Sequence, residues 1–249
     1  MKASIPKAPL FLPTEKAPPE ARPLAELPLL ILVGLTGVGK SSLIERLGYP
    51  TLPDRREVVD RFVLPRYGHS PASQLDRAER FALTRRFRQE YPGGVAEILA
   101  QSRAHPIWPL VMDGLRGAEE VRFALQHLPR SYFVVLEARD LTRLARLLQR
   151  GDAFDRVALD EADWVQLQNL ARGVLSEAEL EEALSWNVPP AELLSKLRIV
   201  AEERKNYDPQ GAKAVLEGSP RALFLDTERL SLEEEVQAVQ AFVRQAAEA

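Results

Sequence analysis

Short apolar runs alternate with longer segments of helical periodicity along the chain. The runs at residues 29–33, 107–112, 132–136 and 221–227 are short and rich in Leu, Ile, Val and Phe, which is typical of strands buried on both faces of a sheet. Between them, apolar residues recur near a spacing of 3.6 and predict helices at residues 71–90, 95–103, 119–128 and 141–149. Repeated strand–helix units predict an α/β fold, with a parallel sheet covered by helices on both faces.

Two segments depart from this alternation. Residues 160–211 have helical periodicity throughout, and Ser176 with Glu179 forms a capping-box pattern at the start of one helix. The chain then returns to a strand and ends in an amphipathic helix that begins after Ser231. We therefore expect a core at residues 27–159 and 219–249, interrupted by a helical insertion at residues 160–218.

The first 26 residues form a proline-rich arm. Six prolines fall in this stretch, and proline removes backbone donors and resists helix formation. The composition favours a loose tail over an arm docked on the domain or on a partner subunit.

A glycine-rich segment follows the first apolar run directly. Residues 34–41 read GLTGVGKS, the phosphate-binding pattern G-x-x-x-x-G-K-S between a strand and a helix. Glycines let backbone N–H groups turn around a phosphate, the helix start adds unpaired N–H groups, and the lysine reaches the β- and γ-phosphates. The residues predicted to bind a nucleoside triphosphate are Gly34, Thr36, Gly37, Val38, Gly39, Lys40, Ser41 and Ser42.

A carboxylate at the end of the second apolar run completes this pattern. The run at residues 107–112 closes in Asp113, followed by Arg116, about 75 residues after the glycine-rich loop. Mg²⁺ takes oxygen ligands, so Ser41 and Asp113 are the predicted metal ligands. Lys40, Asp113 and Arg116 are predicted to be catalytic, because they face the phosphates from the loop and the adjacent strand.

Residues 51–61 occupy the position that faces a second substrate in phosphate-loop kinases. Asp54 or Asp60 would orient or deprotonate an acceptor hydroxyl, and Arg55 or Arg56 would hold an acceptor phosphate. A charged surface loop is the alternative interpretation.

Arginines also recur on the helix at residues 141–149 and just beyond it. Arg143, Arg146 and Arg150 are spaced so that they share one helix face. The spacing suits a lid that covers a transferred phosphate, and Arg146 and Arg150 are its predicted catalytic members. A solvated face is the alternative.

Composition narrows the classes of function. The formal net charge is −3, which disfavours nucleic-acid binding, and the chain has no cysteine, which excludes disulfides and thiolate metal sites. The three histidines match no metal-binding spacing, and no apolar run has the length of a membrane span. A cytoplasmic protein is expected, and an oligomer formed through the arm or the helical insertion stays open.

The order of these parts resembles the group of P-loop kinases that includes adenylate kinase, other nucleoside and nucleotide kinases, and dephospho-coenzyme A kinase. The resemblance spans residues 29–155 and 221–245 and is carried by GLTGVGKS, by VMDGLRG at residues 111–117 and by RLARLLQRGD at residues 143–152. It implies a three-layer α/β/α P-loop fold, ATP and Mg²⁺ at residues 34–42, and lid closure by Arg146 or Arg150. The segment at Asp226 and Thr227 would lie beside the adenine.

Three functions follow as hypotheses. The first is a kinase that transfers the γ-phosphoryl group of ATP to a small nucleotide-like or phosphorylated acceptor. The second is a regulatory NTPase whose helical insertion and arm answer to a protein partner. The third, a nucleic-acid-end kinase, rests on the arginine-rich helix at residues 77–88 and is opposed by the net charge.

Overall fold

The computed structural model of the chain describes residues 5–70, 75, 77–149 and 161–248. The strands are β1 (Leu10–Phe11), β2 (Arg22–Pro23), β3 (Leu29–Val33), β4 (Arg103–Ala104), β5 (Val111–Leu115), β6 (Ser131–Glu137) and β7 (Ala222–Asp226). The helices before β5 are η1 (Leu24–Glu26), α1 (Lys40–Leu47), α2 (Arg55–Val58), η2 (Val59–Val63), α3 (Leu64–Arg66), α4 (Arg77–Glu90) and α5 (Val95–Gln101). The later helices are α6 (Ala118–His127), α7 (Asp140–Leu148), α8 (Glu161–Ala171), α9 (Glu177–Ser185), α10 (Pro190–Asn206), α11 (Pro209–Leu216) and α12 (Leu232–Glu248).

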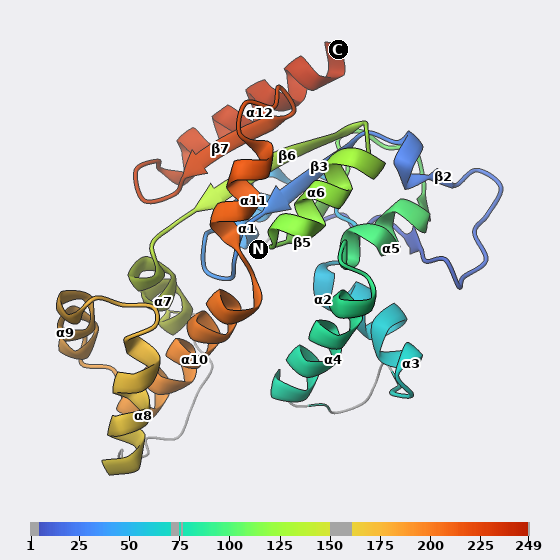
Figure 1. The fold of residues 1–249 in the computed structure, drawn as a ribbon. Coiled ribbons are helices and arrows are strands. Elements are labelled where there is room, and N and C mark those ends of the chain that lie inside the picture. Colours follow the sequence, from blue (N-terminus) through green and yellow to red (C-terminus); the bar gives the residue numbers. More distant parts are fainter. Residues whose placement is uncertain (1–4, 71–74, 76, 150–160, 249) are drawn as a thin grey trace.

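The two faces of β3 divide the interior into two cores (Figure 1). Leu29, Ile31 and Val33 point into the core formed with α5, α6 and α11, and Leu30 and Leu32 point into the core formed with α1 and α12. All five side chains are at most 2% exposed. A strand with a core on each face needs apolar residues at every position, which explains its continuous apolar run.

In the sheet order β5-β3-β6-β7, the strand of this sheet that comes first in the sequence, β3, lies inside the sheet between β5 and β6. β3 pairs in parallel with β5 on one side and with β6 on the other, and β7 pairs in parallel with β6. The connections that leave the carboxyl ends of the strands therefore diverge beside β3, where ligands of open parallel sheets bind. This confirms the predicted α/β fold class, a parallel sheet between two layers of helices, with the loop at residues 34–41 leaving β3 at that crevice.

The second strand is shifted relative to its prediction. The sequence predicts it at residues 107–112, but β5 runs from Val111 to Leu115. Pro109 has no N–H to donate to a ladder, so regular pairing begins beyond it. Asp113 consequently lies within the strand, two residues before its end, and pairs in register with Leu32.

The N-terminal arm is docked on the domain from residue 5 onward, so the expectation of a loose tail is wrong. Leu10, Leu12 and Leu24 are at most 2% exposed. β1 and β2 pair on either side of β4 in a small antiparallel sheet. The prolines space the arm, but the apolar side chains between them supply the burial that holds it in place.

The helices α7 to α10, which follow β6, form a lobe with a core of its own, seen at the lower left of Figure 1. Leu144, Leu167, Leu197 and Val200 of α7, α8 and α10 meet in this core. The predicted capping box of Ser176 is present at the start of α9. The lobe does not coincide with the insertion expected at residues 160–218. α7 lies before residue 160 but packs against α10 of the lobe, and α11 lies within 160–218 but packs against α6 of the core.

We predict that Leu12→Ala lowers the free energy of unfolding by about 2–5 kcal/mol, because it leaves a cavity under a docked arm. Urea unfolding monitored by circular dichroism measures the change. Lys16→Ala, at an exposed position of the same arm, is the matched control and should stay within about 0.5 kcal/mol of the parent protein. Equal stability of the two variants would contradict docking of the arm.

Candidate phosphate site

The loop that leaves β3 turns sharply and enters α1. Gly34 and Gly37 have φ angles of 148° and 89°. A Cβ atom at Gly34 would lie 2.7 Å from a carbonyl oxygen of β6, and one at Gly37 would lie 2.9 Å from a carbonyl oxygen of α7. Both positions therefore require glycine. α1 begins at Lys40, and Ser41 and Ser42 are exposed in its first turn, where unpaired N–H groups can receive an anion.

The ammonium group of Lys40 is buried beneath the loop. Its Nζ donates hydrogen bonds to the carbonyl oxygens of Gly34 at 2.8 Å and Leu35 at 2.9 Å, and lies 3.9 Å from the Asp113 carboxylate. Burial lowers the pKa of Lys40 to about 8, although Asp113 acts to raise it. A phosphate placed beside this group would raise its pKa again, because an adjacent anion favours the charged form of an ammonium.

Asp113 carries a buried oxygen suited to a metal ion. Its Oδ1 has no hydrogen-bond partner in the described part of the chain. Asp113 and Ser41 line the same cavity. Such a pair fits Mg²⁺, which is usually held by one or two protein oxygens together with substrate phosphates and waters. No cluster of three metal-ligating side chains occurs among the described residues, so the ion would depend on the phosphates for its remaining ligands.

Three cavities open around the loop, each named here by its neighbouring element. The α12 cavity, of about 410 Å³, lies between the loop and the segment leading into α12, and its lining includes Gly39, Ser42, Arg146 and Thr227. The loop cavity, of about 150 Å³, includes Thr36, Lys40, Ser41, Asp54 and Asp113. The α4 cavity, of about 530 Å³, includes Arg80, Phe81, Thr84 and Tyr207.

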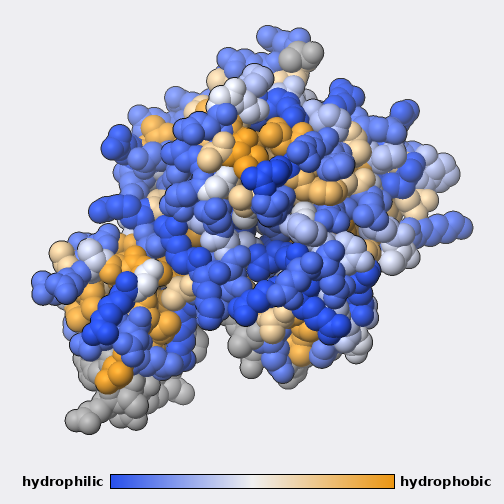
Figure 2. Space-filling model, viewed as in Figure 1, coloured by the Kyte–Doolittle hydropathy of each residue, from blue (hydrophilic) through white to orange (hydrophobic). Residues whose placement is uncertain are grey.

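The three cavities are neighbours, because the loop cavity shares lining residues with each of the other two. Gly37 lines both the α12 cavity and the loop cavity. Thr36, Arg55, Arg56 and Arg116 line both the loop cavity and the α4 cavity. The loop thus has one open side toward β7 and another toward α4, with the buried lysine between them. Space-filling Figure 2 shows hydrophilic side chains around the notch between the two lower lobes of the molecule.

Most of the arginines in the α4 cavity are already paired with carboxylates. These pairs are Arg55 with Glu120, Arg80 with Asp60, and Arg116 with Glu203. Arg56 is exposed, and its side chain has no ion-pair or hydrogen-bond partner among the described residues. Its guanidinium can therefore bind an anionic ligand with all of its donors, without breaking an existing pair.

Arg55 is committed to holding the site together. It is 7% exposed and donates to the Gly114 carbonyl at 3.0 Å and to the Tyr207 hydroxyl at 3.3 Å, in addition to its pair with Glu120. Burial disfavours its charge, but Glu120 and Tyr207 outweigh this and raise the pKa of Arg55 above its ordinary range. Of the two arginines that the sequence offers for an acceptor phosphate, the structure leaves Arg56 available.

Of the two candidate bases, Asp54 and Asp60, one is likewise free to act on a ligand and the other is held in an ion pair. Asp54 lines the loop cavity and caps α2, accepting a hydrogen bond from the Glu57 N–H through Oδ1 at 2.9 Å. Asp60 is paired with Arg80. Asp54 is thus the carboxylate of this segment that faces the phosphate loop.

The predicted lid arginines are placed beside β7. Arg146 donates to the Thr227 hydroxyl at 2.8 Å, to the Thr227 carbonyl at 2.7 Å and to the Gly37 carbonyl at 3.3 Å. Arg146 and Thr227 therefore share the α12 cavity, next to the loop. Arg143 is 1% exposed, so the alternative of a solvated arginine face is wrong for this residue. Arg150 lies outside the described residues.

Sequence reasoning missed Glu203, which lies against the loop from α10. Its carboxylate accepts hydrogen bonds from the Thr36 N–H at 3.0 Å and the Thr36 hydroxyl, and pairs with Arg116 and Arg143. Burial alone would raise the pKa of Glu203, but Arg116, Thr36 and Arg143 hold it below its ordinary value. The sequence does predict that Glu203 is buried, because it continues the helical stripe of Leu193, Leu197 and Val200 that α10 buries.

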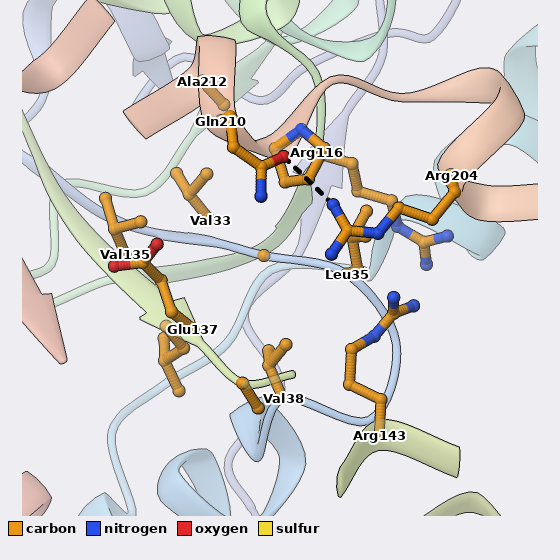
Figure 3. A pocket seen from close by; sticks show the side chains of 14 residues that line it. Val33, Leu35, Val38, Arg116, Val135, Glu137, Arg143, Arg204, Gln210 and Ala212 are labelled. Carbon is orange, nitrogen blue, oxygen red and sulfur yellow. Dashed lines mark hydrogen bonds between the residues drawn. The ribbon is translucent and has the colours of Figure 1, made fainter. Parts of the chain in front are cut away.

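A small cavity of about 50 Å³ lies beside the loop, next to this cluster. Figure 3 shows Arg116, Arg143 and Arg204 on one side of it and Val135 and Glu137 on the other. Arg204 donates to Gln210 at 3.0 Å. The space is about that of a few water molecules, so it holds no organic ligand.

No protein-family model matches this sequence, and no curated protein sequence matches it. Among solved structures, a gluconokinase from Sinorhizobium meliloti 1021 is similar at 17% sequence identity, with a TM-score of 0.41, over 91% of this chain and 96% of that one. So distant a likeness says nothing about the substrate of this chain. None of the helices in the described part of the chain has the length and apolar character of a membrane span.

We predict that affinity for ADP falls as the pH is raised through about 8, the pKa of Lys40 in the free protein. Below that pH the ammonium is charged and binds phosphate, whereas above it binding must take up a proton, which weakens affinity by up to about tenfold per pH unit. Calorimetric titration between pH 7 and 9.5 measures this. Lys40→Met is the control and should show no inflection near pH 8. A flat profile in the parent protein would contradict the role of the buried ammonium.

Proposed function

We propose that this protein is an ATP-dependent kinase that transfers the γ-phosphoryl group to a small anionic acceptor, nucleotide-like or already phosphorylated. The observation that carries the proposal is that three neighbouring cavities, which share lining residues, lie in succession along the phosphate loop. A nucleotide bound with its base and ribose in the α12 cavity would direct its phosphates over Lys40 toward Thr36. Its terminal phosphoryl group would then face the α4 cavity, where an acceptor has room.

Five polar side chains of the loop cavity have a part in this proposal. The N–H groups at the start of α1 and the Lys40 ammonium bind the phosphates, and Arg116 faces the terminal phosphoryl group from the neighbouring strand. Ser41 and Asp113 would hold Mg²⁺, which when bound neutralises phosphate charge and supports the leaving group. Asp54 accepts the proton of the attacking hydroxyl.

The charge of the α4 cavity supports an anionic acceptor. Since Arg56 is unpaired among the described residues, a phosphate or carboxylate on the acceptor would satisfy it. Val59, Leu75 and Phe81 give the same cavity an apolar part. Its volume of about 530 Å³ lies in the range that small-molecule ligands occupy.

A regulatory NTPase is the second candidate, and one observation favours it. Glu203, in a helix that phosphoryl transfer to a small molecule does not require, contacts Thr36 of the loop. Movement of the helical lobe would therefore reach the phosphate site. Stimulation of ATP turnover by a protein partner, with indifference to every small acceptor, would identify this function.

Three arginines of α4 are engaged within the protein, which weighs against the nucleic-acid alternative. Arg80 of α4 is paired with Asp60, and Arg85 and Arg88 donate to Asn206 of α10. These side chains hold elements of the protein together and do not form a free basic face.

We predict that ATP consumption with Mg²⁺ rises at least tenfold in the presence of one class of anionic acceptor. The panel consists of nucleosides, nucleotides, dephospho-coenzyme A, sugars and sugar phosphates. Lys40→Ala should remain folded and lose ATP turnover by about a hundredfold or more, because the phosphates lose their buried cation. Unchanged turnover in this variant would remove the phosphate-loop assignment.

Arg56→Gln should raise the KM of the anionic acceptor about tenfold or more and the KM of ATP much less, because the side chain lines the loop cavity and the α4 cavity but not the α12 cavity. Arg46→Gln, which removes an exposed arginine of α1 that pairs with Glu233, is the matched control. An effect on the KM of ATP alone would place Arg56 on the nucleotide and contradict the assignment of the two cavities.

A further inference from the structure

Glu203 joins three separate parts of the site through one carboxylate. Oε2 accepts from the Thr36 N–H of the loop at 3.0 Å and pairs with Arg143 of α7, while Oε1 accepts from the Thr36 hydroxyl and pairs with Arg116 after β5 at 2.6 Å. The residue is fully buried. Four donors thus converge on a carboxylate that reaches them from a fourth element, α10.

The carboxylate does not itself face a ligand. Glu203 lines neither the α12 cavity nor the loop cavity nor the α4 cavity, whereas Thr36 and Arg116 line the last two. Two guanidinium groups and two donors of Thr36 also occupy the carboxylate, so Glu203 is poorly suited to accept a proton. Any effect of Glu203 on chemistry must therefore pass through Thr36 and Arg116.

We propose that Glu203 is a positioning residue that fixes the Thr36 end of the phosphate loop and the Arg116 guanidinium relative to each other. The inference rests on the proposed function, since it concerns the junction of the loop cavity and the α4 cavity, where phosphoryl transfer would occur.

The geometry explains what such a contact contributes. Arg116 gives one N–H group to Glu203, and its Nε is buried without a partner among the described residues. Arg116 also lines the loop cavity and the α4 cavity. A guanidinium held by a buried carboxylate presents its free donors in one direction, and a misplacement of about 1 Å at a reacting centre costs up to about a hundredfold in rate.

The experiment compares Glu203→Gln with Glu202→Gln in the full-length protein. Both variants remove one negative charge from the same turn of α10, but Glu202 accepts its hydrogen bond from Asn206 and not from the loop. Three quantities are measured: amide hydrogen exchange of Thr36 by NMR without ligand, the Kd of Mg²⁺-ADP, and kcat for ATP turnover. Thermal unfolding corrects each value for the folded fraction.

We expect Glu203→Gln to speed exchange of the Thr36 amide about tenfold or more and to lower kcat by about tenfold or more, with the Kd of ADP changed less than about twofold. Glu202→Gln should leave all three quantities unchanged. This split between kcat and nucleotide affinity is not produced by a general loss of stability.

Three results would overturn the proposal. The first is unchanged exchange at Thr36. The second is a parallel loss of ADP affinity and kcat, which indicates a structural role only. The third is a higher kcat, which indicates that Glu203 competes with the phosphates. If the parent protein turns over no ATP while Thr36 responds as expected, the proposed function falls and the anchoring of the loop by Glu203 stands.

Discussion

The ion pairs around Glu203 are the constraint on which the geometry of the site depends. Arg116, Arg143 and Arg204 share the carboxylates of Glu203 and Asp140, and Arg143 and Glu203 are almost fully buried. Breaking such a buried set by removing one partner costs about 3–5 kcal/mol, because the remaining charges lose their compensation. The set joins the strand β5, the helices α7 and α10, and through Thr36 the phosphate loop. Segments more than a hundred residues apart are thereby held in one arrangement.

The same network leaves a positive surplus at the crevice of the sheet. Three arginines share two carboxylates, and Lys40 lies on the other side of the loop with Asp113. In a cleft with a low dielectric constant, this net positive charge attracts an anion more strongly than it would in bulk water. The helix start of α1 adds to it. An anionic chain of phosphates is the ligand that such a field would favour, and the paired arginines limit where it can lie.

The parts of the molecule set by local pattern are predictable from sequence. Leu29 to Val33 reads as a strand with a core on each face, and Gly34 and Gly37 stand where a side chain would collide with the backbone. What escapes prediction depends on distant partners. The helical period of α10 predicts that Glu203 is buried, but nothing in the sequence identifies Thr36 and Arg116 as its partners. Docking of the arm is not predicted, because the composition shows its prolines but not that Leu12 is buried in the core.

The most direct measurement of the central claim is a crystal structure with Mg²⁺ and a non-hydrolysable ATP analogue. We expect the base beside Thr227, the phosphates over the N–H groups at the start of α1, Mg²⁺ on Ser41 and Asp113, and the terminal phosphate between Thr36 and Arg116. An analogue bound elsewhere, or bound in the reverse direction with its base in the α4 cavity, would contradict the proposed path of phosphoryl transfer.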